Sequence, residues 1–175
     1  MAIKIELSTA TPLPSRTQTL IEKILSSIPR EHLRGIERIK IVDVIKDARL
    51  RITQNALLPG LYHPKQGSQP AWIEVAINAL IPPSRPFYQK ILPRLSFKGN
   101  LAAVIFSLVG QHYYLTLRHS VKKGQIEASV RSYTENQLRL WGTKEHSLRS
   151  RIFKPFQPTL ERWARSLQRQ AKKKS

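Results

Sequence analysis

Apolar and polar residues follow two different periods along this chain, and the periods predict both helices and strands. Over residues 15–27 the apolar positions repeat every three or four residues, which is the spacing of one helix face. Residues 36–45 and 71–77 alternate between apolar and polar, as half-buried strands do. Residues 57–64 predict a shorter strand that is broken by a Pro-Gly turn, and residues 1–14 open with a short extended strand.

The second half of the sequence has a helical pattern. A short helix is expected to end at Pro93, because proline lacks a backbone donor. The most apolar stretch follows and predicts a long, mostly buried helix over residues 101–119. A further helix is expected over 125–140 with its end at Gly142, and a last helix is expected to begin near Thr159. Together these elements predict an α+β fold, with a small sheet packed on helices.

Polar residues that precede the apolar runs are candidate helix N-caps. Their side-chain oxygens accept hydrogen bonds from the first free backbone N–H groups of a helix. Ser15 or Thr17 is the candidate for the first helix, Ser84 for the short helix, and Asn100 for the long helix.

Length and composition limit the class of protein. A chain of 175 residues predicts one domain with an appendage, and 41% hydrophobic residues are enough to bury a core. We expect an α+β domain over residues 1–142 and a basic C-terminal extension over residues 143–175. The chain has no cysteine, which excludes disulfides and a cysteine nucleophile. It has no apolar run near the ~20 residues that span a bilayer and no pattern of a secretory signal. A cytoplasmic protein without a membrane partner is therefore expected.

Charge changes this picture more than any other feature. The 30 Lys and Arg against 11 Asp and Glu give a net charge of +19. Residues 1–114 carry 15 basic and 7 acidic residues, a net +8, while residues 115–175 carry 15 and 4, a net +11. A small soluble domain is well served by a net charge of roughly 2–8. The excess therefore indicates a polyanionic partner, above all nucleic acid, with membrane surfaces and acidic proteins as alternatives.

One stretch of the long predicted helix has the spacing of a metal-binding motif without its ligands. Residues 107–111 read Ser-Leu-Val-Gly-Gln, and the next predicted helix carries Glu127. Upstream, the sequence Leu-Pro-Gly-Leu-Tyr-His-Pro precedes the strand 71–77. Over roughly residues 15–140 this order resembles small zinc-metallopeptidase-like domains of the gluzincin type. In that family a strand pair precedes a helix with the motif H-E-x-x-H, and a Glu on the next helix completes the zinc site.

The resemblance implies a role for four positions. Ser107 and Gln111 stand where the family has its two histidines, Leu108 stands at the general base, and Glu127 at the third ligand. Serine and glutamine are poor neutral zinc ligands, and leucine cannot transfer a proton. The resemblance therefore implies a degenerate zincin-like core that has no catalytic residues and holds no metal or other cofactor.

The histidines of the long helix do not replace the missing ligands. His112 and His119 lie seven residues apart, which is too far along a helix for one ion to bind both of them together with Glu127. His112 is therefore expected to be a helix histidine with satisfied hydrogen bonds. Glu127 also has a structural interpretation, as the ion-pair partner of Lys122, Lys123 or Arg131.

Three carboxylates near predicted strand ends suggest a further alternative. A two-metal nuclease needs such acids clustered in space, and Asp43, Asp47 and Glu74 are the candidates. Their spacing does not require a cluster, so solvated positions are the preferred interpretation. An unrecognised metal-dependent hydrolase is kept as an alternative function.

The basic residues of the last third are the candidates for nucleic-acid binding. Lys and Arg neutralise phosphates, and the sequence has no helix-turn-helix, zinc-finger or RNP-like motif that would read bases. We therefore expect contacts mainly to the backbone of DNA or RNA, in an accessory subunit of a larger nucleoprotein complex. The predicted contact residues are Arg118, Lys122, Lys123, Arg131, Arg139, Lys144, Arg149, Arg151, Lys154, Arg162, Arg165, Arg169, Lys172, Lys173 and Lys174.

A protein-interaction module is the second candidate function. The peptide groove of a degenerate peptidase would bind a partner segment, with the strand 71–77 as an expected site of β-strand addition.

Overall fold

A computed structural model gives the backbone at residues 3–46, 58–81, 87–117 and 125–153, and the side chains at 3–46, 58–81, 97–117 and 125–143. The chain divides into two compact units, Met1–Leu138 and Arg139–Ser175. The sheet and the helices that pack on it belong to the first unit. None of the helices in the described ranges is long and apolar enough to cross a membrane. The predicted division after residue 142 stays a prediction.

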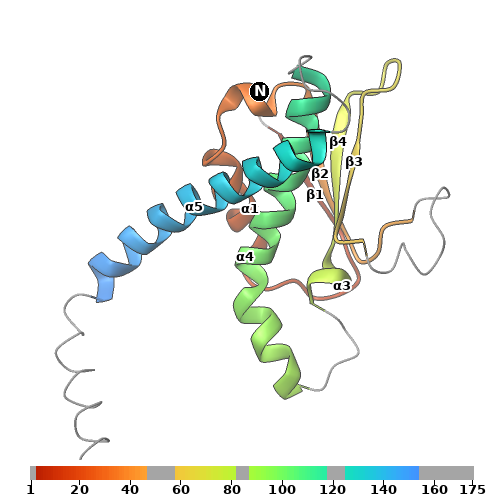
Figure 1. Ribbon diagram of the computed structural model, residues 1–175. Coiled ribbons are helices and arrows are strands. Elements are labelled where there is room, and N and C mark those ends of the chain that lie inside the picture. Colours follow the sequence, from red (N-terminus) through yellow and green to blue (C-terminus); the bar gives the residue numbers. More distant parts are fainter. Residues whose placement is uncertain (1–2, 47–57, 82–86, 118–124, 154–175) are drawn as a thin grey trace, which may run out of the picture. The chain divides into compact units, whose positions relative to one another are not determined.

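A mixed four-stranded sheet is the framework of the first unit (Figure 1). Its strands are β1 (Lys4–Ser8), β2 (Ile36–Val42), β3 (Gly60–His63) and β4 (Ala71–Ala76). They lie in the order β1-β2-β4-β3, with β1 parallel to β2, β2 parallel to β4, and β3 antiparallel to β4. β1 and β3 are therefore the two edges of the sheet.

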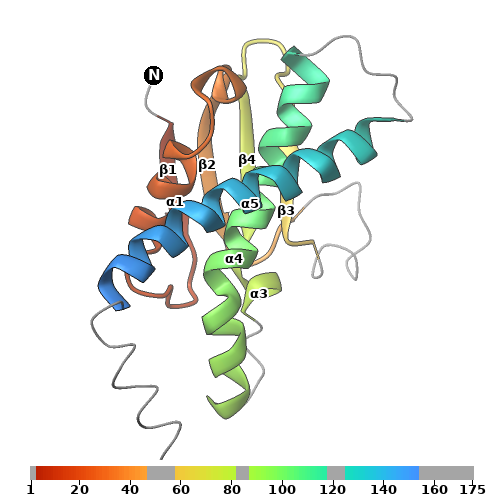
Figure 2. The same ribbon diagram turned by 60° about the vertical axis from the view of Figure 1, so that its left-hand side comes forward.

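The helices of the first unit pack on one face of the sheet, as Figures 1 and 2 show from two directions. The α+β fold class predicted from the sequence is confirmed. The first part of α5 crosses α4 on the side of α4 that is turned away from the sheet. The helical elements are α1 (Thr17–Ser26), the 3₁₀ helix η1 (Arg30–Leu33), α3 (Ile77–Leu80), α4 (Phe87–His112), the π-helical turn η2 (Tyr113–Leu117) and α5 (Ile126–Phe153).

The core lies between the sheet and the helices α1 and α4. Every second residue of β2 and β4 points into it, as the alternation in the sequence predicted. The helices contribute residues at three- and four-residue spacing, which confirms their predicted apolar faces. The fully buried side chains include Ile39, Ile41, Ile73 and Val75 from the strands, and Ile21, Ile24, Leu101, Ile105, Phe106 and Val109 from the helices.

β4 is an interior strand, which corrects the expectation that residues 71–77 lie at the edge of the sheet and the expectation that a partner strand adds there. The sequence suggested that residues 71–77 form an edge strand that a partner would extend, but β4 is paired with β2 on one side and β3 on the other. Its backbone groups are already used in the ladders, so no strand can add there. Any β-strand addition to this sheet would take place at β1 or β3.

Two predicted helix ends do not occur. Pro93 lies inside α4, which runs without interruption from Phe87 to His112 and also passes through the predicted cap Asn100. Proline in a helix costs one backbone hydrogen bond, and the buried apolar residues that follow offset this loss. Gly142 lies inside α5, and a glycine in a helix costs only about 1 kcal/mol relative to alanine.

The start of α1 differs from the predicted cap. The N-cap position is Arg16, with a left-handed φ of 66°, and no side chain caps the helix. The Thr17 hydroxyl instead donates a hydrogen bond to the Pro14 carbonyl at 2.6 Å. Thr17 is buried, so its hydroxyl fixes the turn before the helix rather than the helix end itself.

Asp43 follows β2 and holds the loop that follows β1. Its two carboxylate oxygens accept hydrogen bonds from the backbone N–H groups of Ala10, at 2.7 Å, and Thr11, at 3.0 Å. Hydrogen bonds from Thr11 and Ala10 lower the pKa of Asp43 below its ordinary value. Asp43 therefore has a structural role, and both of its oxygens are engaged.

Replacing Asp43 by asparagine is expected to lower the melting temperature at neutral pH, because one of the two charge-assisted bonds is lost. A carboxylate whose pKa is lowered by folding stabilises the fold above its unfolded pKa of about 4 and loses this effect as the pH falls further. The gap in melting temperature between Asp43→Asn and the wild type should therefore narrow below about pH 4. Calorimetry from pH 3 to pH 7 measures it, and a gap that is independent of pH would contradict the role of the charge.

Candidate functional site

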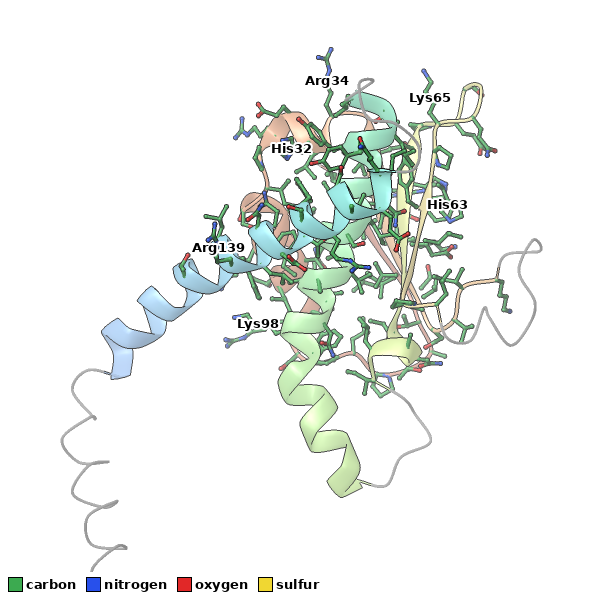
Figure 3. The ribbon with its side chains drawn as sticks, viewed as in Figure 1. His32, Arg34, His63, Lys65, Lys98 and Arg139 are labelled. Atoms are coloured by element: carbon green, nitrogen blue, oxygen red, sulfur yellow. The ribbon has the colours of Figure 1, made fainter. Side chains whose placement is uncertain are left out.

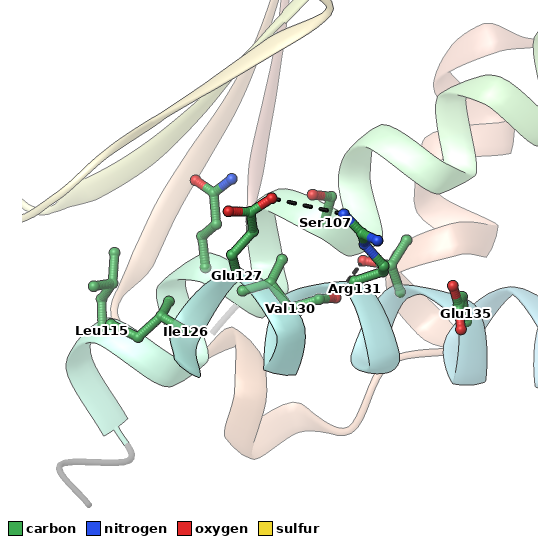
Figure 4. Close-up of a pocket in the computed structure, with 9 residues that line it drawn as sticks. Ser107, Leu115, Ile126, Glu127, Val130, Arg131 and Glu135 are labelled. Carbon is green, nitrogen blue, oxygen red and sulfur yellow. Dashed lines mark hydrogen bonds and ion pairs between the residues drawn. The ribbon is translucent and has the colours of Figure 1, made fainter. Parts of the chain in front are cut away.

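An open pocket lies between α4 and the first turns of α5 (Figure 4). Its volume is about 700 Å³. Three of the four positions that the resemblance singles out, Ser107, Gln111 and Glu127, line it together. The complete lining is Ser107, Gln111, Leu115, Ile126, Glu127, Val130, Arg131, Thr134 and Glu135.

The helix spacing explains why these residues meet. Ser107 and Gln111 lie four residues apart on α4 and therefore share one face of that helix. Glu127 lies in the first turn of α5. The next members of the α5 face, Thr134 and Glu135, were not singled out by the sequence analysis. Their spacing of seven and eight residues from Glu127 is the signal that would have identified them.

Helices α4 and α5 pack closely next to the pocket. A Cβ atom on Gly110 would lie 2.9 Å from the ring of Tyr133, so glycine is needed for this approach. Tyr133 is 7% exposed, and its hydroxyl forms a 2.9 Å hydrogen bond with Nδ1 of His32 in η1. Burial and the neighbouring tyrosines raise the pKa of Tyr133 well above its ordinary value, so the phenol stays protonated. These contacts fix the first turns of α5 against α4.

Leu108, at the position of the general base, points elsewhere. Its side chain is 4% exposed and does not line the pocket. A Cβ atom on Gly60, at the start of β3, would lie 2.7 Å from Leu108 Cδ1 and equally close to Val104. Leu108 is therefore a core residue that packs α4 against the edge strand.

Two of the three charged residues that line the pocket form an ion pair. Arg131 and Glu127 form an i,i+4 ion pair with 3.7 Å between Nη2 and Oε1, which confirms one of the partners predicted for Glu127. Both side chains are mostly exposed, so the pair stabilises the fold by little. It places a guanidinium beside the carboxylate that the resemblance assigns to the third ligand position.

The side chains in this pocket do not fit a zinc ion. Zinc sites use thiolate, imidazole or carboxylate ligands, and the three converging positions supply a hydroxyl, an amide and a carboxylate that already has a cationic neighbour. Among the residues whose side chains are described, no three His, Cys, Asp or Glu residues are grouped so that they would hold a metal.

His112 has the structural role that the sequence predicted. It is 2% exposed, its Nε2–H donates to the Arg34 carbonyl at 2.8 Å, and its Nδ1 accepts from the Tyr62 hydroxyl at 2.9 Å. The residue thus connects α4 with β3 and with the chain segment before β2. Burial lowers the pKa of His112, so the ring is neutral in the folded protein. His119 lies outside the described residues.

Replacing His112 by leucine is expected to reduce the free energy of unfolding by about 2–6 kcal/mol. The change leaves the Arg34 carbonyl and the Tyr62 hydroxyl without their partner, and each orphaned buried group costs about 1–3 kcal/mol. Because the pKa of His112 is lower in the folded state, the unfolded wild type binds more protons than the folded one below about pH 6.5. The wild type therefore becomes less stable as the pH is lowered through this range. Urea titrations from pH 5 to pH 8 should show that His112→Leu lacks this part of the pH dependence. A variant as stable as the wild type would refute the role.

The carboxylates considered for a nuclease are used in other ways. Asp43 holds the loop described above, and Glu74 is 9% exposed with Oε2 at 3.1 Å from His63 Nε2. Asp47 lies outside the described residues. Asp43 and Glu74 therefore both have structural hydrogen-bond partners.

Most of the predicted nucleic-acid contacts lie outside the described side chains. Arg131 and Arg139 are described, and both are exposed. Arg131 belongs to the pocket of the first unit and Arg139 begins the second unit. The predicted contacts without described side chains are Arg118, Lys122, Lys123, Lys144, Arg149, Arg151, Lys154, Arg162, Arg165, Arg169, Lys172, Lys173 and Lys174.

Comparisons of the chain with protein-family models, with curated proteins and with solved structures found no match. Arguments about its function therefore rest on its own residues.

Proposed function

We propose that this chain is a non-catalytic nucleic-acid-binding protein on a degenerate metallopeptidase-like fold, and an accessory subunit of a nucleoprotein complex. The observation that carries the proposal is the distribution of charge. From Lys144 to the C-terminus the sequence has ten basic and two acidic residues. Such a segment attracts phosphates independently of base sequence.

The pocket supports the non-catalytic part of the proposal. Peptide hydrolysis on a gluzincin-type fold needs two imidazole ligands and a carboxylate base. Ser107 and Gln111 supply neither imidazole, and Leu108 is buried against Gly60. A chain with these residues lacks the imidazole ligands and the proton transfer of such a site.

Binding through phosphates predicts a steep dependence on salt. Each phosphate contact on duplex DNA contributes about −0.9 to the slope of log K against log salt concentration. A titration of the full chain with labelled DNA and RNA over a range of salt concentrations tests the proposal. A flat plot would refute phosphate binding, whereas similar slopes for both polymers would indicate recognition of the backbone alone.

A second candidate function, binding of a protein segment, is supported by the apolar part of the pocket. Leu115 is 50% exposed at the pocket wall, beside Ile126 and Val130. Glu127 and Glu135 line the same pocket, so a bound segment would pair an apolar face with basic residues. Substitutions at Leu115 that remove a protein partner and leave nucleic-acid affinity unchanged would favour this function.

A further inference from the structure

The sheet has a second face, turned away from α1 and α4, that carries charged and aromatic side chains. Successive residues of a strand point to opposite faces of the sheet. The residues that alternate with the buried core residues along each strand therefore lie on this second face. Arg38 of β2, Trp72 of β4 and His63 of β3 are register partners, so they form one row across three strands. Figure 3 shows His63 on the side opposite to the helices. Lys4 of β1 is paired with Arg38 and extends the row.

The planar groups of this row stack on one another. The rings of His63 and Trp72 are parallel within 2°, with 3.7 Å between their centroids. The Arg38 guanidinium carbon lies 5.2 Å from the centre of the Trp72 ring, which is a cation–π contact. Trp72 is central because β4 lies between β2 and β3, and His63 ends the row on an edge strand.

The rest of this face divides into an apolar end and a basic end. At the apolar end, Val42 and Ala76 pack with Ile45 and Leu61. The carboxylates at the other end are engaged: Glu6 pairs with Lys4 at 2.9 Å, and Glu74 contacts His63. The cations outnumber these carboxylates, since the alternation also places Lys40 on this face. The exposed Lys65 follows His63 by two residues, beyond the end of β3.

We propose that this row binds single-stranded nucleic acid, with an unpaired base stacked on the outer ring face of His63 and phosphates beside Lys40 and Lys65. A flat aromatic group beside cations is the arrangement with which proteins hold unpaired bases. The bases of a duplex are stacked inside the helix, so they cannot use such a surface. The inference rests on the proposed function and adds to it the class of nucleic acid and a second contact surface outside the C-terminal segment.

Photocross-linking of the full wild-type chain tests this placement directly. The probe is a single-stranded oligonucleotide of about 15 nucleotides with 5-iodouracil at every second position. Tryptic peptide mapping is expected to find cross-links in the peptide that contains Trp72 or in the one that contains His63. Cross-links confined to residues 118–174 would overturn the inference and leave the proposed function intact.

Two substitutions measure the contribution of the row to affinity. His63→Ala and Lys40→Ala leave Trp72 in place, and Lys23→Ala on α1 removes an exposed cation from the helical side as a matched control. Loss of one stacked base corresponds to 1–3 kcal/mol, so His63→Ala should weaken single-strand binding by about 5- to 150-fold. Duplex affinity should change little in any of the three variants.

The outcomes separate this inference from the proposed function. Equal single-strand affinity of His63→Ala and Lys23→Ala overturns the inference, as does equal loss of single-strand and duplex affinity. Displacement of the oligonucleotide by an acidic peptide, without competition from unlabelled single strands, would assign the face to a protein partner. A wild-type chain that binds neither single strands nor duplex refutes the proposed function itself.

Discussion

Replacing five cations near the C-terminus by glutamine is expected to weaken duplex binding by about a thousandfold near physiological salt. Each phosphate contact contributes about −0.9 to the slope of log K against log salt, so the slope should become shallower by about 4 to 5. Fluorescence anisotropy at several salt concentrations measures both quantities. The substituted residues are Arg165, Arg169, Lys172, Lys173 and Lys174.

A matched variant distinguishes local contacts from the effect of net charge. It carries the same number of glutamine substitutions at exposed cations of the first unit, so both variants keep the same formal charge. If binding depends on contacts in the C-terminal segment, this control should keep most of the affinity and nearly the full salt slope. An equal loss in the two variants would show that only the overall charge matters. The control positions are Arg16, Lys23, Arg30, Arg34 and Lys46.

The sequence predicted the sheet well because alternation is a local property. Ile39 and Ile41 are fully buried in β2, and Ile73 and Val75 are fully buried in β4, as the pattern indicated. The pattern does not contain the order of the strands. The strand 71–77 was therefore expected to be a site of β-strand addition, although β4 lies between β2 and β3. Strand order depends on contacts between distant parts of the chain, which a periodicity cannot report.

Helix ends were predicted less well because single residues were given too much weight. Pro93 and Gly142 disfavour helix by a few kcal/mol at most, while burial along α4 favours one continuous helix. The same limit applies to caps. Arg16 takes the N-cap position in a left-handed conformation without a side-chain cap, and the Thr17 hydroxyl is used in the preceding turn.

The pocket between α4 and α5 and the row on the second face of the sheet differ in how far their residues could be identified from the sequence. Ser107, Gln111 and Glu127 were singled out through the resemblance to gluzincin-type domains, and only Ser107 and Gln111 could be placed on one face from their four-residue spacing. The row of Arg38, Trp72 and His63 was not identified. Its members come from three strands, and only the register between β2, β4 and β3 brings them together.

Introducing two histidines is expected to convert the pocket into a zinc site. In Ser107→His/Gln111→His/Arg131→Gln, two imidazoles would lie one turn apart on α4, and Glu127 would lose its cationic neighbour. Two histidines and a glutamate form the three-ligand set of catalytic zinc sites. The purified triple variant should bind about one zinc ion per chain in metal analysis, and the wild type none.

The control for this experiment adds Glu127→Gln to the triple variant. It keeps both imidazoles and removes the third ligand, so zinc affinity should fall by about tenfold or more, which corresponds to about 1.4 kcal/mol. Circular dichroism shows whether each variant is folded. A folded triple variant without zinc would mean that the α4 and α5 positions do not approach as metal ligands must, and the resemblance to the gluzincin type would fail. If both variants bind zinc with equal affinity, Glu127 is not the third zinc ligand, and the two histidines on α4 alone account for the binding.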